Sequence, residues 1–283
     1  MPMNSLVSRI ILLLGACLLG TSGAFACPQA AGLADYNCDG DAVVVVIGDS
    51  LVSGVGDASN GNQGGYVLRT QTRFPDAAIV NQGVPGLRTL TLLKNLRRAF
   101  ANSSTSKLAQ DLIKADVVVL DLGRNDRWNF GPPAATLRNL KRLRQIIQSS
   151  VPRSGGVAPL VVTAVLMSPN RGSQSPWVKE LDNLILKSHS VEHPANLRFD
   201  LVSKRLLQPD NIHPTSQGYA AMAKVFVSYL LKEYREYVGV LRQDQDNDGL
   251  YDIFEASRFG TDPTLADTDG DGIKDGNDPT PAG

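Results

Sequence analysis

The chain has 283 residues, 42% of them hydrophobic and 20% charged, which is long enough for one full α/β domain with an appendage. The formal net charge is zero, but ten Asp and one Glu stand against one Arg and one Lys from residue 244 onward, so this end is strongly acidic. The acidic end and the lack of a recognisable nucleic-acid-binding motif argue against a nucleic-acid partner.

The first 26 residues have the pattern of a signal peptide. Arg9 precedes an apolar run at 10–14 and 18–19, and Ala24-Phe25-Ala26 has the small-x-small pattern that signal peptidase cuts after. We therefore expect cleavage after Ala26 and a secreted or periplasmic protein without membrane association. A lipoprotein signal with Cys17 as the lipidated residue is the alternative. A retained anchor is disfavoured, because a span needs about 20 apolar residues.

Two cysteines remain after this cleavage, Cys27 and Cys38. An even pair in an oxidising compartment predicts one disulfide, which would hold the N-terminal segment 27–42. The alternative is two free thiols. Neither cysteine has a histidine nearby in the sequence, so neither is expected to be catalytic.

Apolar runs of strand length alternate with longer amphipathic stretches between 43 and 238, which is typical of repeated βαβ units. The predicted strands are 43–47, 78–80, 117–122, 160–166 and 197–201. The predicted helices are 65–74, 89–101, 136–149, 176–189 and 216–237. The pattern predicts an α/β fold, a three-layer α/β/α sandwich of flavodoxin-like kind with a five-stranded parallel sheet. It lacks the Gly-x-Ser-x-Gly elbow of the α/β-hydrolase fold.

Four short polar segments carry the chemistry, and the first three directly follow predicted strands. They are Gly48-Asp49-Ser50-Leu51, Asn81-Gln82-Gly83-Val84-Pro85-Gly86, Gly123-Arg124-Asn125-Asp126 and Asp210-Asn211-Ile212-His213-Pro214. The carboxyl ends of parallel strands are where α/β folds expose reactive groups. In this order, the four segments resemble the SGNH (GDSL-type) hydrolase family of esterases and lipases, and the resemblance covers roughly 43–231.

The resemblance implies a serine hydrolase. Ser50 is the expected nucleophile, His213 the base that takes its proton, and Asp210 the carboxylate that orients the imidazole. The expected oxyanion donors are the backbone N–H groups of Ser50 and Gly86 and the side-chain amide of Asn125. Gly86 is preferred to Gly83 because a short polar stretch follows it, as in the family.

Alone, each of these residues would more often be a turn or a helix cap, because Ser, Asn and Asp favour such positions. Their joint order is what favours catalysis. Arg124, Arg127 and Trp128 are particular to this chain and are expected at the substrate mouth. Trp128 and Trp177 each fit either the core or the wall of an acyl pocket.

The acidic end, residues 244–283, contains two calcium-loop patterns, in which carboxylates at alternate positions converge and a glycine permits the sharp turn. The expected ligands are Asp244, Asp246, Asp248, Leu250 (through its carbonyl), Asp252 and Glu255 in the first, and Asp267, Asp269, Asp271, Ile273 (through its carbonyl), Asp275 and Asp278 in the second. The segment resembles thrombospondin type 3 repeats, and calcium is expected to be structural, with no cofactor for catalysis. The alternative is a disordered acidic tail.

We therefore expect a monomeric carboxylic ester hydrolase acting on acyl esters of lipids or small molecules. A polysaccharide O-deacetylase is the second possibility: a bulky apolar groove would favour the first function, and an open polar cleft would favour the second. A calcium-dependent surface-binding module on an inactive hydrolase scaffold is the non-enzyme alternative. It is disfavoured because Ser50 and His213 are both present.

Overall fold

The computed structural model describes residues 30–37, 39–129, 131–170, 174–190, 193–241, 243–252, 255 and 259–283. The predicted signal peptide, Cys17, Cys27 and Cys38 lie outside these residues, so the cleavage, the lipidation alternative and the disulfide stay predictions. The described residues belong to two compact units, Cys27–Glu233 and Tyr234–Gly283. Each unit is described by itself below.

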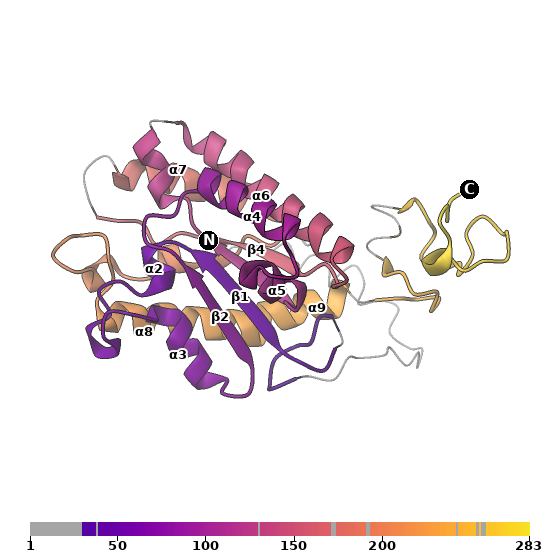
Figure 1. Ribbon diagram of the computed structural model, residues 1–283, viewed down its shortest axis with the longest axis horizontal. Helices are drawn as coiled ribbons and strands as arrows, with labels where there is room; N and C mark the ends of the chain where they lie inside the picture. Colours follow the sequence, from indigo (N-terminus) through magenta and orange to yellow (C-terminus); the bar gives the residue numbers. More distant parts are fainter. Residues whose placement is uncertain are drawn as a thin grey trace, which may run out of the picture. The chain divides into compact units, whose positions relative to one another are not determined.

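A five-stranded parallel sheet forms the centre of the first unit (Figure 1). Its strands are β1 (Val43–Gly48), β2 (Ala78–Gly83), β3 (Val117–Asp121), β4 (Leu160–Val165) and β5 (Leu197–Arg198). The order β2-β1-β3-β4-β5, with every neighbouring pair parallel, is that of flavodoxin-like folds. The predicted fold class is therefore confirmed.

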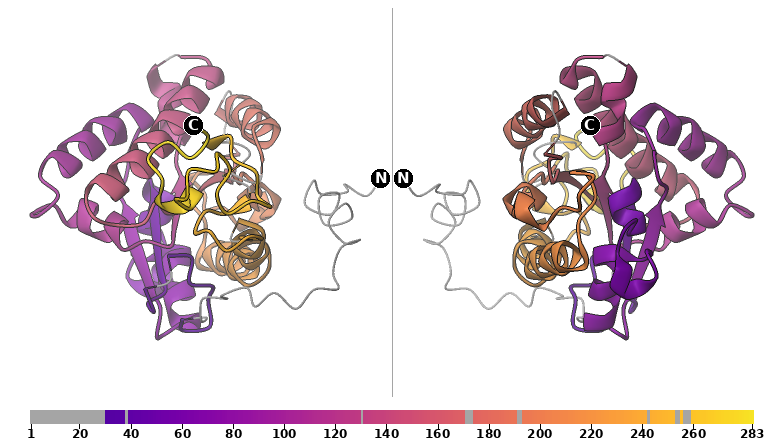
Figure 2. Two further views of the ribbon diagram at one scale, coloured as in Figure 1. Left: turned by 90° about the vertical axis from the view of Figure 1, so that its right-hand side faces the viewer. Right: turned by 90° about the vertical axis from the view of Figure 1, so that its left-hand side faces the viewer.

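Helices cover both faces of this sheet, and the two helical layers are also visible after a quarter turn in Figure 2. One layer contains α4 (Thr89–Ala101), α5 (Lys107–Ile113), α6 (Pro133–Arg153) and α7 (Gln174–Lys187), and the other contains α3 (Gly65–Arg73) and α8 (Ser216–Tyr229). Every residue of β1, β3 and β4 is buried, because helices on both faces leave no solvated side.

Successive side chains of β1 point into different layers of the core. Val45 and Ile47 pack in the cluster formed with α4 to α7, as the two-residue period of a strand requires. A second cluster contains the rings of Tyr66, Phe199 and Phe226, with the Tyr66 centroid 4.8 Å from that of Phe199 and 5.8 Å from that of Phe226. The first of these clusters thus packs against β1, the strand that leads to Ser50.

The register brings the carboxyl ends of three strands to one level. Gly48 pairs with Gly83 of β2 and with Asp121 of β3. A Cβ atom on Gly48 would lie 2.3 Å from the carbonyl oxygen of Asp121, so glycine is needed where β1 ends. The segments that follow β1, β2 and β3 consequently start close together.

Several boundaries differ from the sequence prediction. The last strand ends at Arg198 and continues as a 3-10 turn, Phe199–Leu201, instead of reaching residue 201. Helix α6 starts at Pro133, because proline presets the backbone angle of a first helical turn. The helix predicted at 216–237 comprises α8, a π-helical stretch at Leu230–Tyr234 and α9 (Arg235–Leu241). The short helix α5 was not predicted.

Short 3-10 segments occupy connecting loops at Ala58–Asn60, Arg124–Asn129, Lys204–Leu206 and Asp275–Asn277. In the part of the chain that is described, no helix is long and apolar enough to cross a membrane.

Candidate active site

Ser50 is the first residue of α2 (Ser50–Ser53), which begins where β1 ends. The side chain of Asp49 caps this short helix and accepts a hydrogen bond of 3.1 Å from the backbone N–H of Leu51. A capping Asp satisfies a helix-terminal donor that would otherwise lack a partner. The cap therefore fixes the turn that presents Ser50 at the carboxyl edge of the sheet.

The side chains of Ser50, His213 and Asp210 form a continuous hydrogen-bonded chain. Nε2 of His213 lies 3.0 Å from Oγ of Ser50, and Nδ1 of His213 lies 2.6 Å from Oδ2 of Asp210. These distances are within the reach that a nucleophile and a base need. The three residues predicted from the sequence are thus brought together in the order that serine hydrolysis requires.

The loop that holds Asp210 and His213 is braced by its own backbone. Oδ1 of Asp210 accepts hydrogen bonds from the N–H groups of Ile212 (2.8 Å) and His213 (3.0 Å). Burial raises the pKa of Asp210, but the hydrogen bonds from the His213 ring and these N–H groups outweigh it, so the pKa lies below its usual range. Asp210 therefore stays ionised and able to accept from the imidazole.

A second set of bonds ties this loop to the segment that follows α2. Gln208 donates from its side chain to the carbonyl of Gly56, 2.8 Å away, and its backbone N–H donates to the carbonyl of His213. Gly56 lies just after α2. The distance between Ser50 and His213 is consequently set by a loop contact and by the sheet together.

The predicted oxyanion donors lie around one side-chain amide. Nδ2 of Asn125 donates to the carbonyl of Leu87 (3.2 Å) and, with a longer bond of 3.5 Å, to Oδ2 of Asp49. Leu87 follows Gly86 and Asp49 precedes Ser50. Asn125 therefore bonds to the residues that neighbour both other predicted donors in the sequence.

The two glycines of the second segment have different surroundings. A Cβ atom on Gly83 would lie 2.3 Å from the backbone nitrogen of Ser53, so this glycine allows β2 to pack against α2. Gly86 has a positive φ of 76° and open space where a side chain would be. Glycine is favoured at this position because of its backbone angle and not because of a close neighbour. Such a backbone can present its N–H at an exposed turn.

Arg124 does not line the substrate mouth, and that prediction is wrong. Its side chain is 4% exposed and forms ion pairs with Asp121 (2.6 Å) and Asp49 (3.3 Å). The two buried carboxylates need a buried cation nearby, which explains the inward orientation. Arg127 is half-buried, and the side chain of Trp128 lies outside the described part. Trp177 is partly buried against the core and donates to the carbonyl of Gly131.

Asp126 supports the site, although sequence reasoning gave it no role. Its carboxylate accepts from the backbone N–H of Thr89 (2.9 Å), from the Thr89 hydroxyl and from the hydroxyl of Thr136 (3.0 Å). It thereby joins the start of α4, just after Gly86, to the segment that carries Asn125. The Asn-Asp dipeptide was visible, but its partners are distant in sequence.

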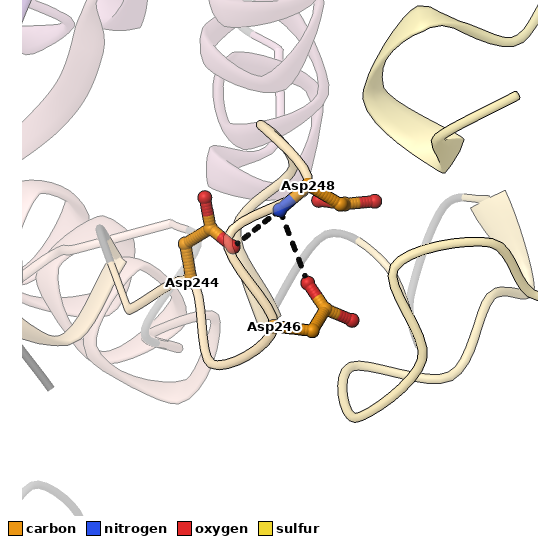
Figure 3. Close-up of side chains that lie close together, drawn as sticks. All are labelled: Asp244, Asp246 and Asp248. Atoms are coloured by element: carbon orange, nitrogen blue, oxygen red, sulfur yellow. Dashed lines mark hydrogen bonds between the residues drawn. The ribbon is translucent and has the colours of Figure 1, made fainter.

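The acidic end, in the second unit, gathers its carboxylates into three groups. Asp244, Asp246 and Asp248 lie on one loop, where the backbone N–H of Asp248 donates to the carboxylates of the other two (Figure 3). The other two groups are Asp248, Glu255 and Asp275, which are buried, and Asp267, Asp269 and Asp271. Within each group, one oxygen per residue lies within 4.8 Å of the others.

The remaining predicted ligands are placed differently. Asp252 and Asp278 belong to none of these groups, and they accept from the backbone N–H groups of Gln245 and Thr280. Leu250 and Ile273 are predicted to bind calcium through their backbone carbonyl oxygens. The backbone N–H of Leu250 donates to Asp248 and that of Ile273 to Asp271, as in tight Asx turns.

The carboxylate oxygens fit a hard cation. Within the described residues, one buried oxygen each of Asp246, Asp248, Glu255 and Asp278 has no hydrogen-bond partner. Burial and the charges of Asp246 and Asp248 raise the pKa of Glu255 to about 7. Crowded, unpartnered oxygens of this kind are the ligands that Ca²⁺ prefers.

The comparisons with known proteins agree with the geometry. A family model described as GDSL-like Lipase/Acylhydrolase family matches residues 46–221. No curated protein matches the sequence.

Several solved structures resemble this chain at low sequence identity. The psychrotrophic esterase EstA from Pseudoalteromonas sp. has a TM-score of 0.50 at 18% identity, covering 69% of this chain and 99% of its own. A lipolytic protein of the G-D-S-L family from Veillonella parvula gives 0.50 at 15%, covering 67% and 98%. A carbohydrate esterase family 3 protein from Talaromyces cellulolyticus gives 0.48 at 15%, covering 69% and 99%. The chain therefore belongs to the GDSL-like lipase/acylhydrolase family, which in general terms makes it an ester hydrolase.

Proposed function

We propose that the protein is a secreted or periplasmic serine esterase that hydrolyses carboxylic esters through an acyl-enzyme. The observation that carries the proposal is the chain of hydrogen bonds from Ser50 through His213 to Asp210. Membership of the GDSL-like family supports the reaction class. Export is supported by the leader pattern of the first 26 residues.

In the first half-reaction, Oγ of Ser50 attacks the ester carbonyl carbon while Nε2 of His213 takes the hydroxyl proton. The imidazole then carries a positive charge, which Asp210 stabilises through Nδ1. The tetrahedral intermediate collapses when the bond to the alcohol oxygen breaks and His213 returns the proton to it. In the second half-reaction, water attacks the acyl-enzyme by the same steps and releases the acid.

The negative charge on the intermediate needs donors aimed at the former carbonyl oxygen. The proposed donors are the N–H groups of Ser50 and Gly86 and the amide of Asn125. The hydrogen bond from Asn125 to Asp49 is long, at 3.5 Å, and therefore weak. The Asn125 amide can exchange it for a hydrogen bond to the oxyanion at a small cost in free energy. One such donor typically contributes about 100-fold to 1000-fold in rate.

The proposed substrates are acyl esters of lipids or small molecules. Val84 and Leu90 flank the Gly86 segment and are 52% and 51% exposed, so apolar side chains lie on the same stretch as a proposed oxyanion donor. Such side chains favour contact with an acyl chain over contact with a sugar. A preference for acetyl esters would instead support the polysaccharide O-deacetylase.

We also propose that the acidic end binds calcium. When bound, the ion would offset the mutual repulsion of the carboxylates. Asp244, Asp246 and Asp248 would hold it in the first loop, Asp267, Asp269 and Asp271 in the second, and the buried group of Asp248, Glu255 and Asp275 offers further oxygens. Its role is structural, because the proposed triad needs no metal for acyl transfer.

Hydrolysis of a chain-length series of p-nitrophenyl esters tests the enzymatic proposal. The wild type is compared with Ser50→Ala and with Ser53→Ala, a matched change at the other end of α2. We expect activity in the wild type and in Ser53→Ala and its loss in Ser50→Ala. If none of the three cleaves any ester and calcium-dependent binding remains, the surface-binding module takes the place of the enzyme.

A further inference from the structure

A buried cluster of charged and polar side chains lies where β1 and β3 end. Its members are Asp49, Asp121, Arg124 and Tyr66, and each is between 0% and 4% exposed. Burying ions costs several kcal/mol per ion unless each is paired and hydrogen-bonded. The catalytic steps above use none of these four side chains directly.

Arg124 connects the ends of three neighbouring strands. Its Nη2 atom lies 2.6 Å from Oδ1 of Asp121, the last residue of β3, and its Nη1 atom lies 3.3 Å from Oδ2 of Asp49, just after β1. Its Nε atom donates to the carbonyl of Met167, just after β4, at 3.1 Å. One planar guanidinium thus bonds to three separate segments through its three nitrogen atoms. The single side-chain nitrogen of a lysine cannot reproduce this arrangement.

Asp49 is the member that touches the proposed catalytic groups. It caps the helix that starts with Ser50, and it accepts from the Asn125 amide. It therefore joins the nucleophile segment to the oxyanion segment. Burial raises the pKa of Asp49, and Arg124 acts in the opposite direction, so the arginine favours the ionised form that accepts all these bonds.

Asp121 has its own second donor. The hydroxyl of Tyr66 donates to Oδ2 of Asp121 at 3.0 Å, so Asp121 is held by Tyr66 and Arg124 together. Asp49 relies on Arg124 as its charged partner. Loss of the arginine would leave Asp121 with a donor from α3 but would leave Asp49 without a cation.

We propose that Arg124 is a positioning residue for catalysis, which acts by fixing the Asp49 carboxylate and through it the relative placement of Ser50 and Asn125. The proposal rests on the ester hydrolysis proposed above. Arg124 touches neither the substrate nor the reacting atoms. Its effect should therefore fall on kcat and leave KM nearly unchanged.

The test measures kcat, KM and the melting temperature of Arg124→Met with p-nitrophenyl butyrate. A misplacement of about 1 Å at a reacting centre can cost on the order of 100-fold in rate, and we expect a loss of that size in kcat. If Arg124→Met does not fold, Arg124→Lys keeps the charge and loses the shared geometry, and a smaller loss of kcat is expected.

Two further variants separate positioning from stability. Arg124→Met leaves the buried carboxylates of Asp49 and Asp121 without their cation, and adding Asp121→Asn removes one of these two negative charges. The double variant should therefore recover part of the melting temperature that Arg124→Met loses, while kcat stays low. Arg198→Met removes an arginine whose two bonds to Asp200 are 2.7 Å long, on the edge strand β5. It should lower stability at most slightly and leave kcat unchanged.

The proposal is overturned if Arg124→Met keeps the wild-type kcat, or if kcat returns with the melting temperature in the double variant. It is supported if kcat stays low in the double variant while KM and the fold are retained. A wild type that hydrolyses no ester would overturn the proposed function as well, whereas an active wild type with an equally active Arg124→Met overturns only the positioning role.

Discussion

Nε2 of His213 lies 3.0 Å from Oγ of Ser50, although the two residues are 163 positions apart in the sequence. The sheet brings Ser50 to the carboxyl edge of β1, and the bond from Gln208 to Gly56 holds the histidine loop against the segment after α2. The contact depends on both. It explains how the proposed nucleophile and the proposed base, from opposite ends of the domain, come within hydrogen-bond distance.

Replacing Asp210 with Asn should lower kcat on the order of 10,000-fold, because an amide can stabilise the wrong imidazole tautomer and carries no charge to offset the imidazolium. The two backbone bonds to Oδ1 should survive, so the fold should be retained. Asp76→Asn, an exposed aspartate, is the matched control. Equal kcat in both variants, measured with p-nitrophenyl acetate, would remove Asp210 from the triad.

The two glycines of the second segment should respond differently to alanine. Gly83→Ala places a Cβ atom 2.3 Å from the backbone of Ser53, so we expect a lower melting temperature. Gly86→Ala strains a backbone with positive φ but meets no neighbour, so we expect a loss of kcat that exceeds its loss of stability. Melting temperature and kcat of both variants test this. The reverse pattern would point to Gly83 as the oxyanion donor.

Asp182 predicts a pH dependence of stability. Burial raises its pKa to about 7, despite the hydrogen bond from the N–H of Leu166. The folded chain therefore holds the proton more tightly than the unfolded chain, whose ordinary value is 3.8. Protonated Asp182 therefore stabilises the fold fully below pH 3.8, the pKa of the unfolded chain. This stabilisation is lost as the pH rises towards the folded pKa, and each unit of pKa difference corresponds to about 1.4 kcal/mol.

Asp182→Asn should remove this loss. The free energy of unfolding, from urea denaturation at about pH 5 and about pH 8, should then shift in favour of the variant at the higher pH. Asp76→Asn, at an exposed aspartate, is the control variant. An unfolding free energy of Asp182→Asn that follows the wild type at both pH values would exclude the titration of Asp182 in this range.

A site residue could be predicted when its role follows from a short motif, and could not when its bonding partners are distant in the sequence. Ser50, Asp210 and His213 each lie in a short motif whose residue types are specific in combination, so their meeting could be predicted without coordinates. Arg124 has one partner nearby, Asp121, but its other partners, Asp49 and the Met167 carbonyl, are 75 and 43 residues away, so the sequence around Arg124 does not show that the side chain turns inward. Asp126 was missed for the same reason.

The fold followed the hydrophobic pattern where that pattern was strong. The valine-rich runs of β1 and β3 could be predicted nearly to the residue, since strands buried on both faces have continuous apolar sequences. The edge strand β5 pairs through only two residues and then turns at Phe199, which the apolar run could not show. The π-helical stretch at Leu230–Tyr234 likewise has no sequence signature.

Calcium removal should loosen the acidic end and leave ester hydrolysis intact. Glu255→Gln removes one buried carboxylate charge from the group that also contains Asp248 and Asp275. Calcium should therefore protect the acidic end of this variant from proteolysis less than it protects the acidic end of the wild type. Asp262→Asn, outside the three groups, is the control. Limited proteolysis with and without chelator, read by mass spectrometry, measures this.

Two results would contradict that separation. One is a loss of soluble-ester hydrolysis on chelation with full recovery on adding calcium, which would make the metal necessary for catalysis. The other is a cleavage pattern that calcium does not change in the wild type, which would favour the disordered acidic tail.

Covalent labelling of the nucleophile tests the central claim most directly. The mature protein is incubated with an alkyl fluorophosphonate, and the intact mass and peptide map are recorded for the wild type, Ser50→Ala and His213→Ala. We predict a single adduct on Ser50, its absence from Ser50→Ala, and slow formation in His213→Ala, because the base must take the hydroxyl proton. Ester hydrolysis that persists in Ser50→Ala, or an adduct on another residue, would contradict the proposed mechanism.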